Sequence, residues 1–358
     1  MGIKNFNKFL REKSEHIFEN VHLSEYAYKK VAIDISLYLF KFKAVCGDKW
    51  LNTFINLICS LRRNEIHCVF IYDGQAPPEK EAEKQKRKEE KEKLQQQVFE
   101  LEEALNVYHK TGTIEQILVD LYKRKKSPTN KRLLGNNTKN NIDMNWISYK
   151  IEQKRAQIID ISPNDFQFTK DLFDILEVPY YTAPSEAEKF CSKLCIDGIV
   201  DAVLSEDTDI IAYGTPVFLS KIDTKNDQCV RINNKNILNS LQLSQPQLLD
   251  LCIMSGTDYN DNIFKIGGHK AYALLKEHNN IDGIRNNTNI DTSILNYTRV
   301  KQLFTEFEPY NINNIPYCGK PDFNKLANFV KTHKLAINID KIKDNFTREI
   351  VFADSDSD

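Results

Sequence analysis

Short apolar runs alternate with helical patterns in two parts of the chain, residues 1–73 and 164–222. Such alternation is typical of βαβ units and predicts a mostly parallel sheet. The runs of strand length end at Asp34, at Asp73, near residue 181, at residue 204 and at residue 219; the helical patterns cover residues near 5–12, 49–63, 166–176 and the stretch after Pro184. We therefore expect an α/β fold with a mostly parallel central sheet flanked by helices.

Residues 79–103 have a different pattern, in which Glu, Lys and Gln dominate and no large apolar residue precedes Leu94. A helix this polar cannot bury a face in a core, so we expect it to project and to be held by i,i+4 Glu–Lys pairs. A solvated surface helix or a linker is the alternative. Residues 133–141 are predicted to be a flexible loop. From residue 243 onward the pattern is mostly helical, with loops near 279–297 and 308–320.

Charge is distributed unevenly along the chain, although the formal net charge of its 358 residues is only −1. Residues 121–155 contain ten Lys/Arg against two Asp/Glu, whereas residues 156–260 contain seven against sixteen. The first stretch suits phosphates and the second suits cations. Eight cysteines without C-x-x-C spacing predict buried or free thiols. No apolar run has the length of a membrane helix and no signal-peptide core is seen, so we expect an intracellular protein without a membrane partner.

Seven acidic residues lie where a strand-like run ends or a helix begins: Asp34, Asp73, Glu186, Glu188, Asp207, Asp209 and Asp258. The carboxyl ends of parallel strands meet in one crevice, where such folds bind their ligands. Carboxylates gathered there repel one another unless divalent cations hold them. Hydrolysis of a phosphodiester by two metal ions needs such a set of acids. The pattern therefore predicts a metal-dependent phosphoryl-transfer site, and no Ser–His or Cys–His pairing competes with it.

Several of these acids also have a simpler local interpretation. Three of them would serve as turn formers or helix caps: Asp34, Asp73 and Asp258. Ser185 to Glu188 matches a capping box, which explains Glu188 and leaves Glu186 unexplained. The spacing of Asp207 and Asp209 also begins an EF-hand loop, but the Gly and the final Glu of that loop are absent.

Taken in order, the motifs resemble those of the flap endonuclease/XPG family of structure-specific 5′ nucleases. They are MGI at 1–3, VAID at 31–34, DG at 73–74 with PP at 77–78, APSEAE at 183–188, EDTD at 206–209, GTDY at 256–259 and IGGHKA at 266–271. The resemblance covers roughly residues 1–95 and 160–335. It implies a PIN-like nuclease core, a projecting helical arch and a C-terminal helix–two-turn–helix region.

The resemblance also implies a division of the chain into five regions. They are an N-terminal nuclease region with the start of the arch (1–105), a basic cap or arch insertion (106–160), an internal nuclease region (161–260), a helical duplex-binding region (261–340) and a polar acidic tail (341–358). Between Arg87 and Glu186 the chain is longer than in a typical flap endonuclease, so the cap is expected to be enlarged.

Site residues follow from the resemblance at matching positions. All seven acids would belong to a site for two Mg²⁺ ions. Lys80 and Arg87 would be catalytic residues that engage the scissile phosphate, with Arg87 stabilising its charge; membership of the solvated Glu/Lys run is the alternative. Phe40 falls where the family often has a Tyr that stacks on a base, and a core position is the alternative. The implied DNA-binding residues are Gly2, Phe40, Gly256, Gly267, Gly268 and Lys270.

Residues 260–280 resemble the family's helix–two-turn–helix, whose backbone amides grip duplex phosphates together with a monovalent cation, here near residues 260–271. The match is loose, because Lys265 and Gly268 stand where the usual pattern has Gly and Pro.

The expected function is that of a Mg²⁺-dependent, structure-specific DNA endonuclease: a 5′ flap endonuclease with 5′–3′ exonuclease character, acting on branched or flap DNA in replication or repair. The enlarged cap favours a junction- or bubble-cutting relative as the first alternative. A non-catalytic nucleic-acid-binding scaffold and an RNA-cleaving relative are the others. No sliding-clamp motif is seen near the C-terminus, so clamp binding is not expected. We expect a monomer in the nucleus, or in the host nucleus if the source is viral.

Overall fold

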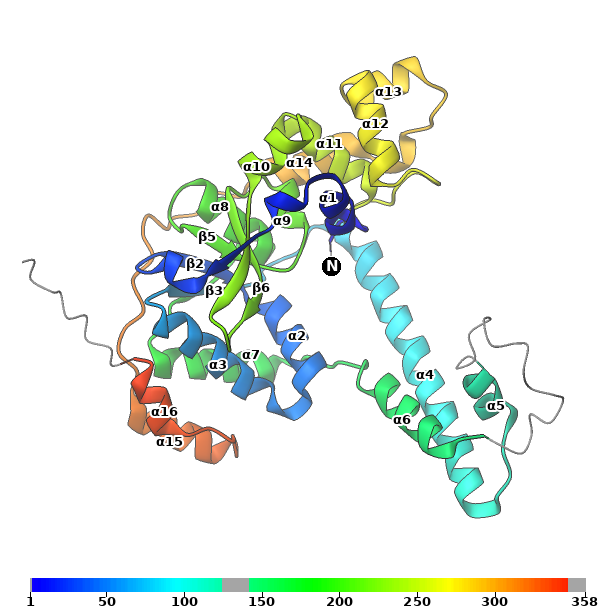
Figure 1. Ribbon diagram of the computed structural model, residues 1–358, viewed down its shortest axis with the longest axis vertical. Helices are drawn as coiled ribbons and strands as arrows, with labels where there is room; N and C mark the ends of the chain where they lie inside the picture. Colours follow the sequence, from blue (N-terminus) through cyan, green and yellow to red (C-terminus); the bar gives the residue numbers. More distant parts are fainter. Residues whose placement is uncertain (1, 124–141, 347–358) are drawn as a thin grey trace, which may run out of the picture. The chain divides into compact units, whose positions relative to one another are not determined.

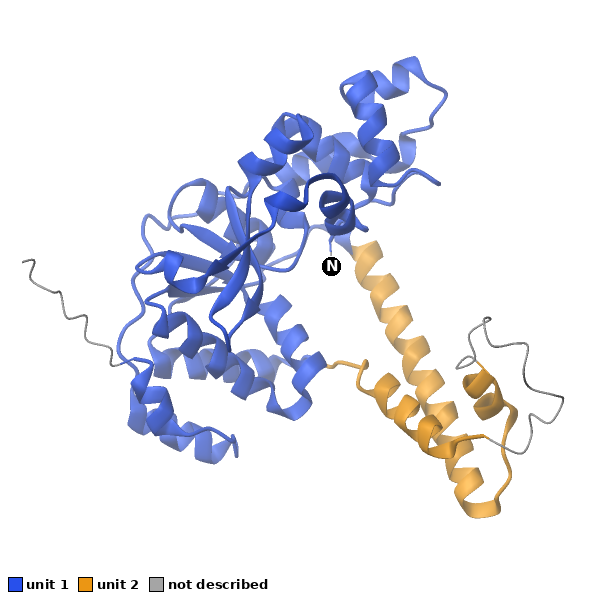
Figure 2. Cartoon of the chain, viewed as in Figure 1, with its two compact units in different colours: residues 1–80, 161–358 blue, residues 81–160 orange. Residues whose placement is uncertain are grey.

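The computed structural model describes residues 2–123 and 142–346. The chain divides into two compact units (Figure 2): unit 1 comprises Met1–Lys80 and Ile161–Asp358, and unit 2 comprises Glu81–Asp160. The predicted flexible loop at 133–141 and most of the predicted acidic tail lie outside the described residues.

A seven-stranded sheet stands at the centre of the described part of unit 1 (Figure 1). Its strands are β1 (Glu19–His22), β2 (Lys30–Asp34), β3 (His67–Tyr72), β4 (Tyr180–Thr182), β5 (Ala202–Leu204), β6 (Val217–Asp223) and β7 (Gln228–Asn233). Their order is β1-β7-β6-β5-β2-β3-β4. Neighbours from β6 to β4 pair in parallel, whereas β7 pairs antiparallel with β6 and with β1. The expected mostly parallel α/β sheet is confirmed.

The sequence pattern did not predict the two antiparallel strands. β1 is only four residues long and mostly polar, and its single buried side chain is Val21. β7 follows β6 through a tight turn in which Asp223 Oδ1 accepts hydrogen bonds from Lys225 N and Asn226 N. Both strands form because pairing partners are available, which local propensity does not reveal.

Helices surround the sheet in unit 1. They are α1 (Phe6–Ser14), α2 (Ile35–Cys46), α3 (Trp50–Arg63), α7 (Pro163–Leu176), α8 (Ala187–Ile196), α9 (Asp209–Ala212), α10 (Asn234–Leu241), α11 (Gln245–Ser255), α12 (Gly268–His278), α13 (Ile281–Asn287), α14 (Tyr297–Thr305), α15 (Phe323–Thr332) and α16 (Ile339–Asp344). The four predicted helices of residues 1–222 correspond to α1, α3, α7 and α8.

The sequence pattern missed several helices, among them α2, α9, α10 and α13. α2 is apolar on most sides, so its sequence lacks a helical period. α13 lies inside the predicted loop at 279–297, and that prediction is wrong over Ile281–Asn287. The side chain of Asn280 accepts a hydrogen bond from Gly283 N and caps α13. A glycine in so short a helix lowers its intrinsic propensity, which explains the error.

Side chains of the parallel strands alternate between two cores. Val31 and Ile33 of β2 pack with residues of α2, α3 and α7, whereas Ala32 packs with residues of α1, α8 and α11. The sheet is thus covered on both faces, as parallel sheets generally are. Asp34 follows these apolar positions at the carboxyl end of β2, so the edge of the sheet begins with an acid.

Unit 2 is helical and consists of α4 (Glu81–Thr111), α5 (Gln116–Lys123) and α6 (Met144–Arg155) in its described part. A helix is confirmed over Glu81–Thr111 and the linker alternative is wrong, but the expectation that this helix buries no face is wrong for its second half. The buried residues of α4 all lie in its second half, at Val98, Leu101 and Ala104, where they pack with α5 and α6. In the first half, Glu83 and Arg87 form an i,i+4 pair, with Arg in place of the expected Lys.

All eight cysteines are free thiols, and seven of them are buried, as predicted. None of the helices in residues 2–123 and 142–346 combines the length and the apolar content that a membrane crossing requires.

Candidate metal and nucleic-acid site

Acidic residues from four neighbouring strand ends meet at one edge of the sheet. Asp34 ends β2, Asp73 follows β3, Glu186 and Glu188 begin α8 after β4, and Asp207 and Asp209 follow β5. Because β5, β2, β3 and β4 are adjacent and parallel, their carboxyl ends lie side by side. The seventh acid, Asp258, comes from the turn after α11 and interacts electrostatically with Asp207 and Asp209. The structure therefore brings together residues that are more than 200 positions apart.

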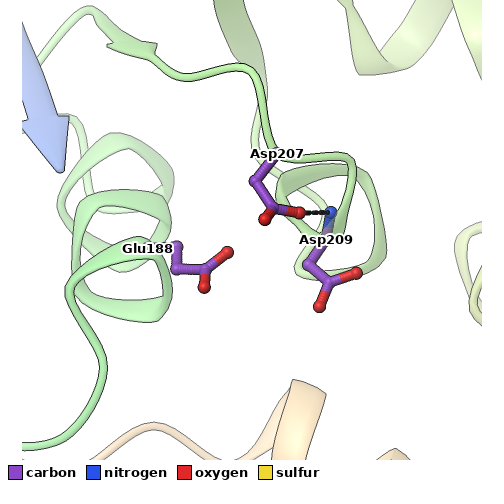
Figure 3. Close-up of side chains that lie close together, drawn as sticks. All are labelled: Glu188, Asp207 and Asp209. Carbon is purple, nitrogen blue, oxygen red and sulfur yellow. Dashed lines mark hydrogen bonds between the residues drawn. The ribbon is translucent and has the colours of Figure 1, made fainter. Parts of the chain in front are cut away.

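Three of these acids form a compact cluster (Figure 3). One carboxylate oxygen each from Glu188, Asp207 and Asp209 lies within 4.8 Å of the others. Only 9, 3 and 2% of the three residues' surfaces are exposed. The backbone N–H of Asp209 donates to Asp207 Oδ1 over 2.9 Å, which fixes the two acids relative to each other. The carboxylate of Glu188 faces this pair from α8.

Within the described part of the chain, two carboxylate oxygens of the cluster lack hydrogen-bond donors, and a divalent cation would supply the missing positive partner. Glu188 Oε2 and Asp209 Oδ1 are buried and have no hydrogen-bond partner among the described residues. Burial, reinforced by Asp207, raises the pKa of both Glu188 and Asp209 well above the ordinary carboxyl range. Buried carboxylates without donors are costly unless a proton or a cation joins them. Oxygen ligands of this kind are those that Mg²⁺ and Ca²⁺ prefer, so the residues fit such an ion.

Asp34 is both a helix cap and one of the acids at the sheet edge, the two interpretations that the sequence left open. Its Oδ1 accepts hydrogen bonds from Ser36 N at 2.8 Å and Leu37 N at 3.3 Å, so the helix-cap alternative is confirmed. Burial and the neighbouring charge of Asp73 also raise the pKa of Asp34 to about 8. Asp73 itself accepts hydrogen bonds from Ser36 Oγ at 2.6 Å and from Ala187 N at 2.9 Å, which ties the end of β3 to the start of α8.

The capping-box interpretation of Ser185 and Glu188 is wrong. α8 begins at Ala187, and its N-cap residue, Glu186, makes no side-chain capping hydrogen bond. Both glutamates instead point to Lys80, whose Nζ pairs with Glu186, lies 3.4 Å from Glu188 Oε1 and lies 3.7 Å from Asp258 Oδ2.

Lys80 is 13% exposed at its side chain, so the solvated alternative is wrong for this residue. Burial alone would lower the pKa of Lys80, but the charges of Glu188 and Glu186 outweigh burial and raise it. One ammonium group thus offsets part of the negative charge of the acids.

Replacing Lys80 with Met should destabilise the metal-free protein by about 3 kcal/mol at pH 8, because buried carboxylates lose their cation. The loss should shrink as pH falls, because burial raises the pKa of Glu188 and a proton on it takes over part of this role. Lys41→Met is the control: Lys41 forms an ion pair with Glu206, and both side chains are about one-third exposed, so the loss should be at most about 1 kcal/mol. Urea unfolding of both variants tests this, and equal losses would contradict the role given to Lys80.

Two tyrosines at the site were not predicted. Tyr259 donates a hydrogen bond from its hydroxyl to Glu186 Oε2, and its oxygen lies 2.8 Å from the hydroxyl of Tyr213. Tyr259 directly follows Asp258 in the GTDY motif, so the motif could have indicated it. No sequence signal links Tyr213 to it, because the two rings meet only in the folded chain.

Gly2 lies against the acid cluster. Its φ is +76°, and a Cβ placed there would lie 2.0 Å from Asp207 Oδ1 and 2.8 Å from Asp209 Oδ1. Only glycine fits, because the space that a side chain needs is filled by carboxylates.

Gly2→Ala should therefore reduce the metal-dependent phosphodiester cleavage expected from the sequence by about 10²-fold, the cost of a displacement near 1 Å at a reacting centre. Gly198→Ala is the matched control: Gly198 has a similar φ of +72° but nothing within 4 Å of the added carbon. Both variants bear the same backbone strain, and only Gly2→Ala should lose activity. Equal activity of the two variants in a cleavage assay would refute the contact.

Phe40 and Arg87 are both at least partly exposed. Phe40 is 43% exposed on α2, so the core alternative is wrong, and its stacking role stays a prediction. Arg87 belongs to unit 2, where its Nε donates to Glu83 Oε1 over 2.9 Å. The surface-pair alternative describes this contact, and the catalytic role of Arg87 also stays a prediction.

The remaining predicted DNA-binding residues lie around α11 and α12. Gly256 ends α11 with φ +91°, Gly267 is the N-cap residue of α12 with open space around it, and Gly268 packs against α1. Lys270 is exposed on the first turn of α12. Lys265 has φ +60°, the left-handed conformation that a glycine adopts without strain. The backbone therefore takes the unusual conformation even though the glycine expected from the resemblance is replaced.

Comparisons with known proteins agree with this site. Residues 1–94 match the XPG N-terminal domain and residues 177–258 match the XPG I-region, the two stretches that carry the acids. The probable RAD2-like endonuclease 369L of Invertebrate iridescent virus 6 is 33% identical, covering 95% of this chain and 90% of its own. Flap endonuclease 1 of Zea mays is 28% identical, covering 86% of this chain and 76% of its own.

A solved structure shows the same fold. The catalytic core of Rad2, in complex with a DNA substrate, has a TM-score of 0.66 at 18% identity and covers 96% of this chain and 98% of its own. The matched domains, the viral relative and the acidic sheet edge lead to one conclusion: this chain belongs to the flap endonuclease/XPG family of structure-specific nucleases.

Proposed function

We propose that this nuclease hydrolyses phosphodiester bonds in branched DNA with Mg²⁺, as a 5′ flap endonuclease with 5′–3′ exonuclease character. The observation that carries the proposal is the acid cluster, in which one buried carboxylate oxygen each of Glu188 and Asp209 has no hydrogen-bond partner among residues 2–123 and 142–346. A protein that only binds DNA gains nothing from such charge, because buried acids beside a phosphate backbone weaken binding. The clustered acids therefore support catalysis over a scaffold function.

Two Mg²⁺ ions held by the seven acids are the form of the site that we propose. Mg²⁺ keeps several waters and takes one or two carboxylates directly, so some acids would act through water. The chemistry that such ions supply is activation of the attacking water and neutralisation of charge on the entering and leaving oxygens. Glu188, Asp207 and Asp209 are the set whose spacing best suits direct contact with one ion.

The other predicted residues would act on the DNA itself. The ammonium of Lys80 would leave its carboxylate partners and pair with the scissile phosphate. The guanidinium of Arg87 would stabilise negative charge on that phosphate. Phe40 would stack on a base next to the cut. Gly2 would keep the space beside Asp207 free of a side chain.

Duplex DNA would be held by the start of α12. The backbone amides near the exposed Gly267 and the ammonium of Lys270 would bind phosphate oxygens, since a helix N-terminus carries partial positive charge. A monovalent cation near residues 260–271 would complete this contact. Unit 2 would contact the 5′ single strand. Binding should weaken steeply with salt, as expected for phosphate contacts.

A second candidate is a nuclease that prefers four-way junctions or bubbles. It is favoured by the length of the chain between Arg87 and Glu186, since this stretch would decide which strands reach the acids. In either case we propose that the enzyme acts as a monomer in nuclear DNA replication or repair, without recruitment by a sliding clamp.

Cleavage of end-labelled flap, nicked, gapped and four-way substrates, each with Mg²⁺ or with EDTA, tests the proposal. We expect metal-dependent cuts at the base of the 5′ flap and slower shortening from the 5′ end at nicks. Preference for the four-way substrate would favour the second candidate. No cleavage of any substrate in Mg²⁺ would refute both.

A further inference from the structure

A chain of hydrogen bonds runs from one side of the acidic site through two tyrosines. The hydroxyl of Tyr259 contacts Glu186 Oε2, and the hydroxyl of Tyr213 lies 2.8 Å from that of Tyr259. The other oxygen of Glu186 pairs with Lys80. Both carboxylate oxygens of Glu186 are thus occupied, and its orientation is set by two different groups.

The direction of this chain follows from its protons. An ionised carboxylate only accepts hydrogen bonds, so the single hydroxyl proton of Tyr259 is directed to Glu186. Tyr259 can then only accept from Tyr213, and Tyr213 must donate. When Tyr213 donates to Tyr259, it polarises the hydroxyl of Tyr259 and strengthens the hydrogen bond from Tyr259 to Glu186. Removal of the Tyr213 hydroxyl should therefore weaken the bond at Glu186.

Packing holds both rings in place. The ring of Phe304, on α14, lies 4.8 Å from that of Tyr213 and 5.1 Å from that of Tyr259, centre to centre. Tyr213 N donates to Asp209 O over 3.1 Å, and Tyr259 adjoins Asp258 in the chain. The two tyrosines therefore connect three acid-bearing segments: the start of α8, the turn at α9 and the turn after α11.

We propose that Tyr213 and Tyr259 are positioning residues that hold the carboxylate of Glu186 in the orientation required for metal binding. This inference rests on the proposed function, because it takes Glu186 to be one of the metal ligands. Groups that orient a ligand typically change metal affinity by about 10- to 100-fold when they are removed.

Tyr259→Phe and Tyr213→Phe each remove one oxygen and keep the ring packing. We expect Tyr259→Phe to raise the Mg²⁺ concentration for half-maximal cleavage by about 10- to 100-fold, and Tyr213→Phe to raise it less. Saturating Mg²⁺ should restore most of kcat in both variants. Without DNA, calorimetric Mg²⁺ titration should show the same order of affinities. Tyr26→Phe is the control, because Tyr26 is buried and hydrogen-bonded to Arg231, with no acid of the site among its partners.

The same substitutions in a Glu186→Gln background decide how the tyrosines act. If they act through Glu186, Tyr259→Phe should cause no further loss there. An equal loss in both backgrounds would mean that Tyr259 acts independently of Glu186 and would overturn the proposal. A lower melting temperature with unchanged Mg²⁺ dependence would do the same. Failure of the proposed function is distinguishable, because the parent protein would then show no Mg²⁺-dependent cleavage.

Discussion

Asp207→Asn should abolish cleavage in Mg²⁺ while flap-DNA binding persists and the metal-free protein becomes more stable. The amide keeps the shape of the side chain, and its oxygen can still accept the hydrogen bond from Asp209 N. What it removes is one negative charge from a buried cluster in which burial raises the pKa of Asp207. Loss of a direct ligand should cost more than the roughly 100-fold that loss of an outer partner costs.

Three measurements on one sample test this prediction: the single-turnover cleavage rate, DNA affinity by fluorescence anisotropy and urea unfolding in EDTA. Asp165→Asn provides the contrast. Asp165 is also buried, but its hydrogen bonds with Lys43 and Ser162 outweigh burial and lower its pKa. That variant should lose stability and keep its cleavage rate. If Asp207→Asn cuts at the parental rate, or if it is destabilised like Asp165→Asn, the assignment of the metal site is wrong.

The second large effect is an inverse dependence of metal-free stability on pH. The pKa values of Asp34, Glu188, Asp207 and Asp209 are all raised by burial, that of Asp34 to about 8. Between the unfolded value near pH 4 and the raised folded value, the native state binds more protons than the unfolded state. Stability must therefore fall as pH rises, by about 1.4 kcal/mol per pH unit for each carboxyl that retains its proton.

Mg²⁺ should reverse this trend. As the proposed ligand of the ionised carboxylates, it should stabilise the protein more at pH 8.5 than at pH 6, by about 2.7 kcal/mol when its concentration is 100 times its Kd. Thermal unfolding at both pH values, in EDTA and in Mg²⁺, measures the effect.

Asp209→Asn should flatten the metal-free slope, which separates the site from other groups that titrate in this window. Carboxyls with lowered pKa, such as Asp165 and Asp227, titrate below this window and leave it unaffected. A metal-free protein that gains stability from pH 6 to 8.5 would argue against the cluster.

Local pattern was sufficient for much of the fold. The apolar runs that end at Asp34, Asp73 and residue 204 have the composition of buried strands, and the right-handed crossover rule brings their ends together. The exposed first half of α4 follows from its lack of large apolar residues before Leu94, whereas its second half is buried by α5 and α6. The strands β1 and β7 could not be predicted in this way, because their residues gain stability from partners that lie far away in the sequence.

The sequence by itself determined the chemistry available to this protein: seven acids at strand and helix ends, and motifs that identify the family. Only the tertiary structure decided how those groups are used. It placed Lys80 among three carboxylates, made Asp34 both a helix cap and one of the acids at the sheet edge, and rejected the capping box at Glu188. It also brought Tyr213 to Tyr259. The physical reason is that side-chain identity is a local property, whereas burial, charge proximity and hydrogen-bond partners depend on which distant segments meet.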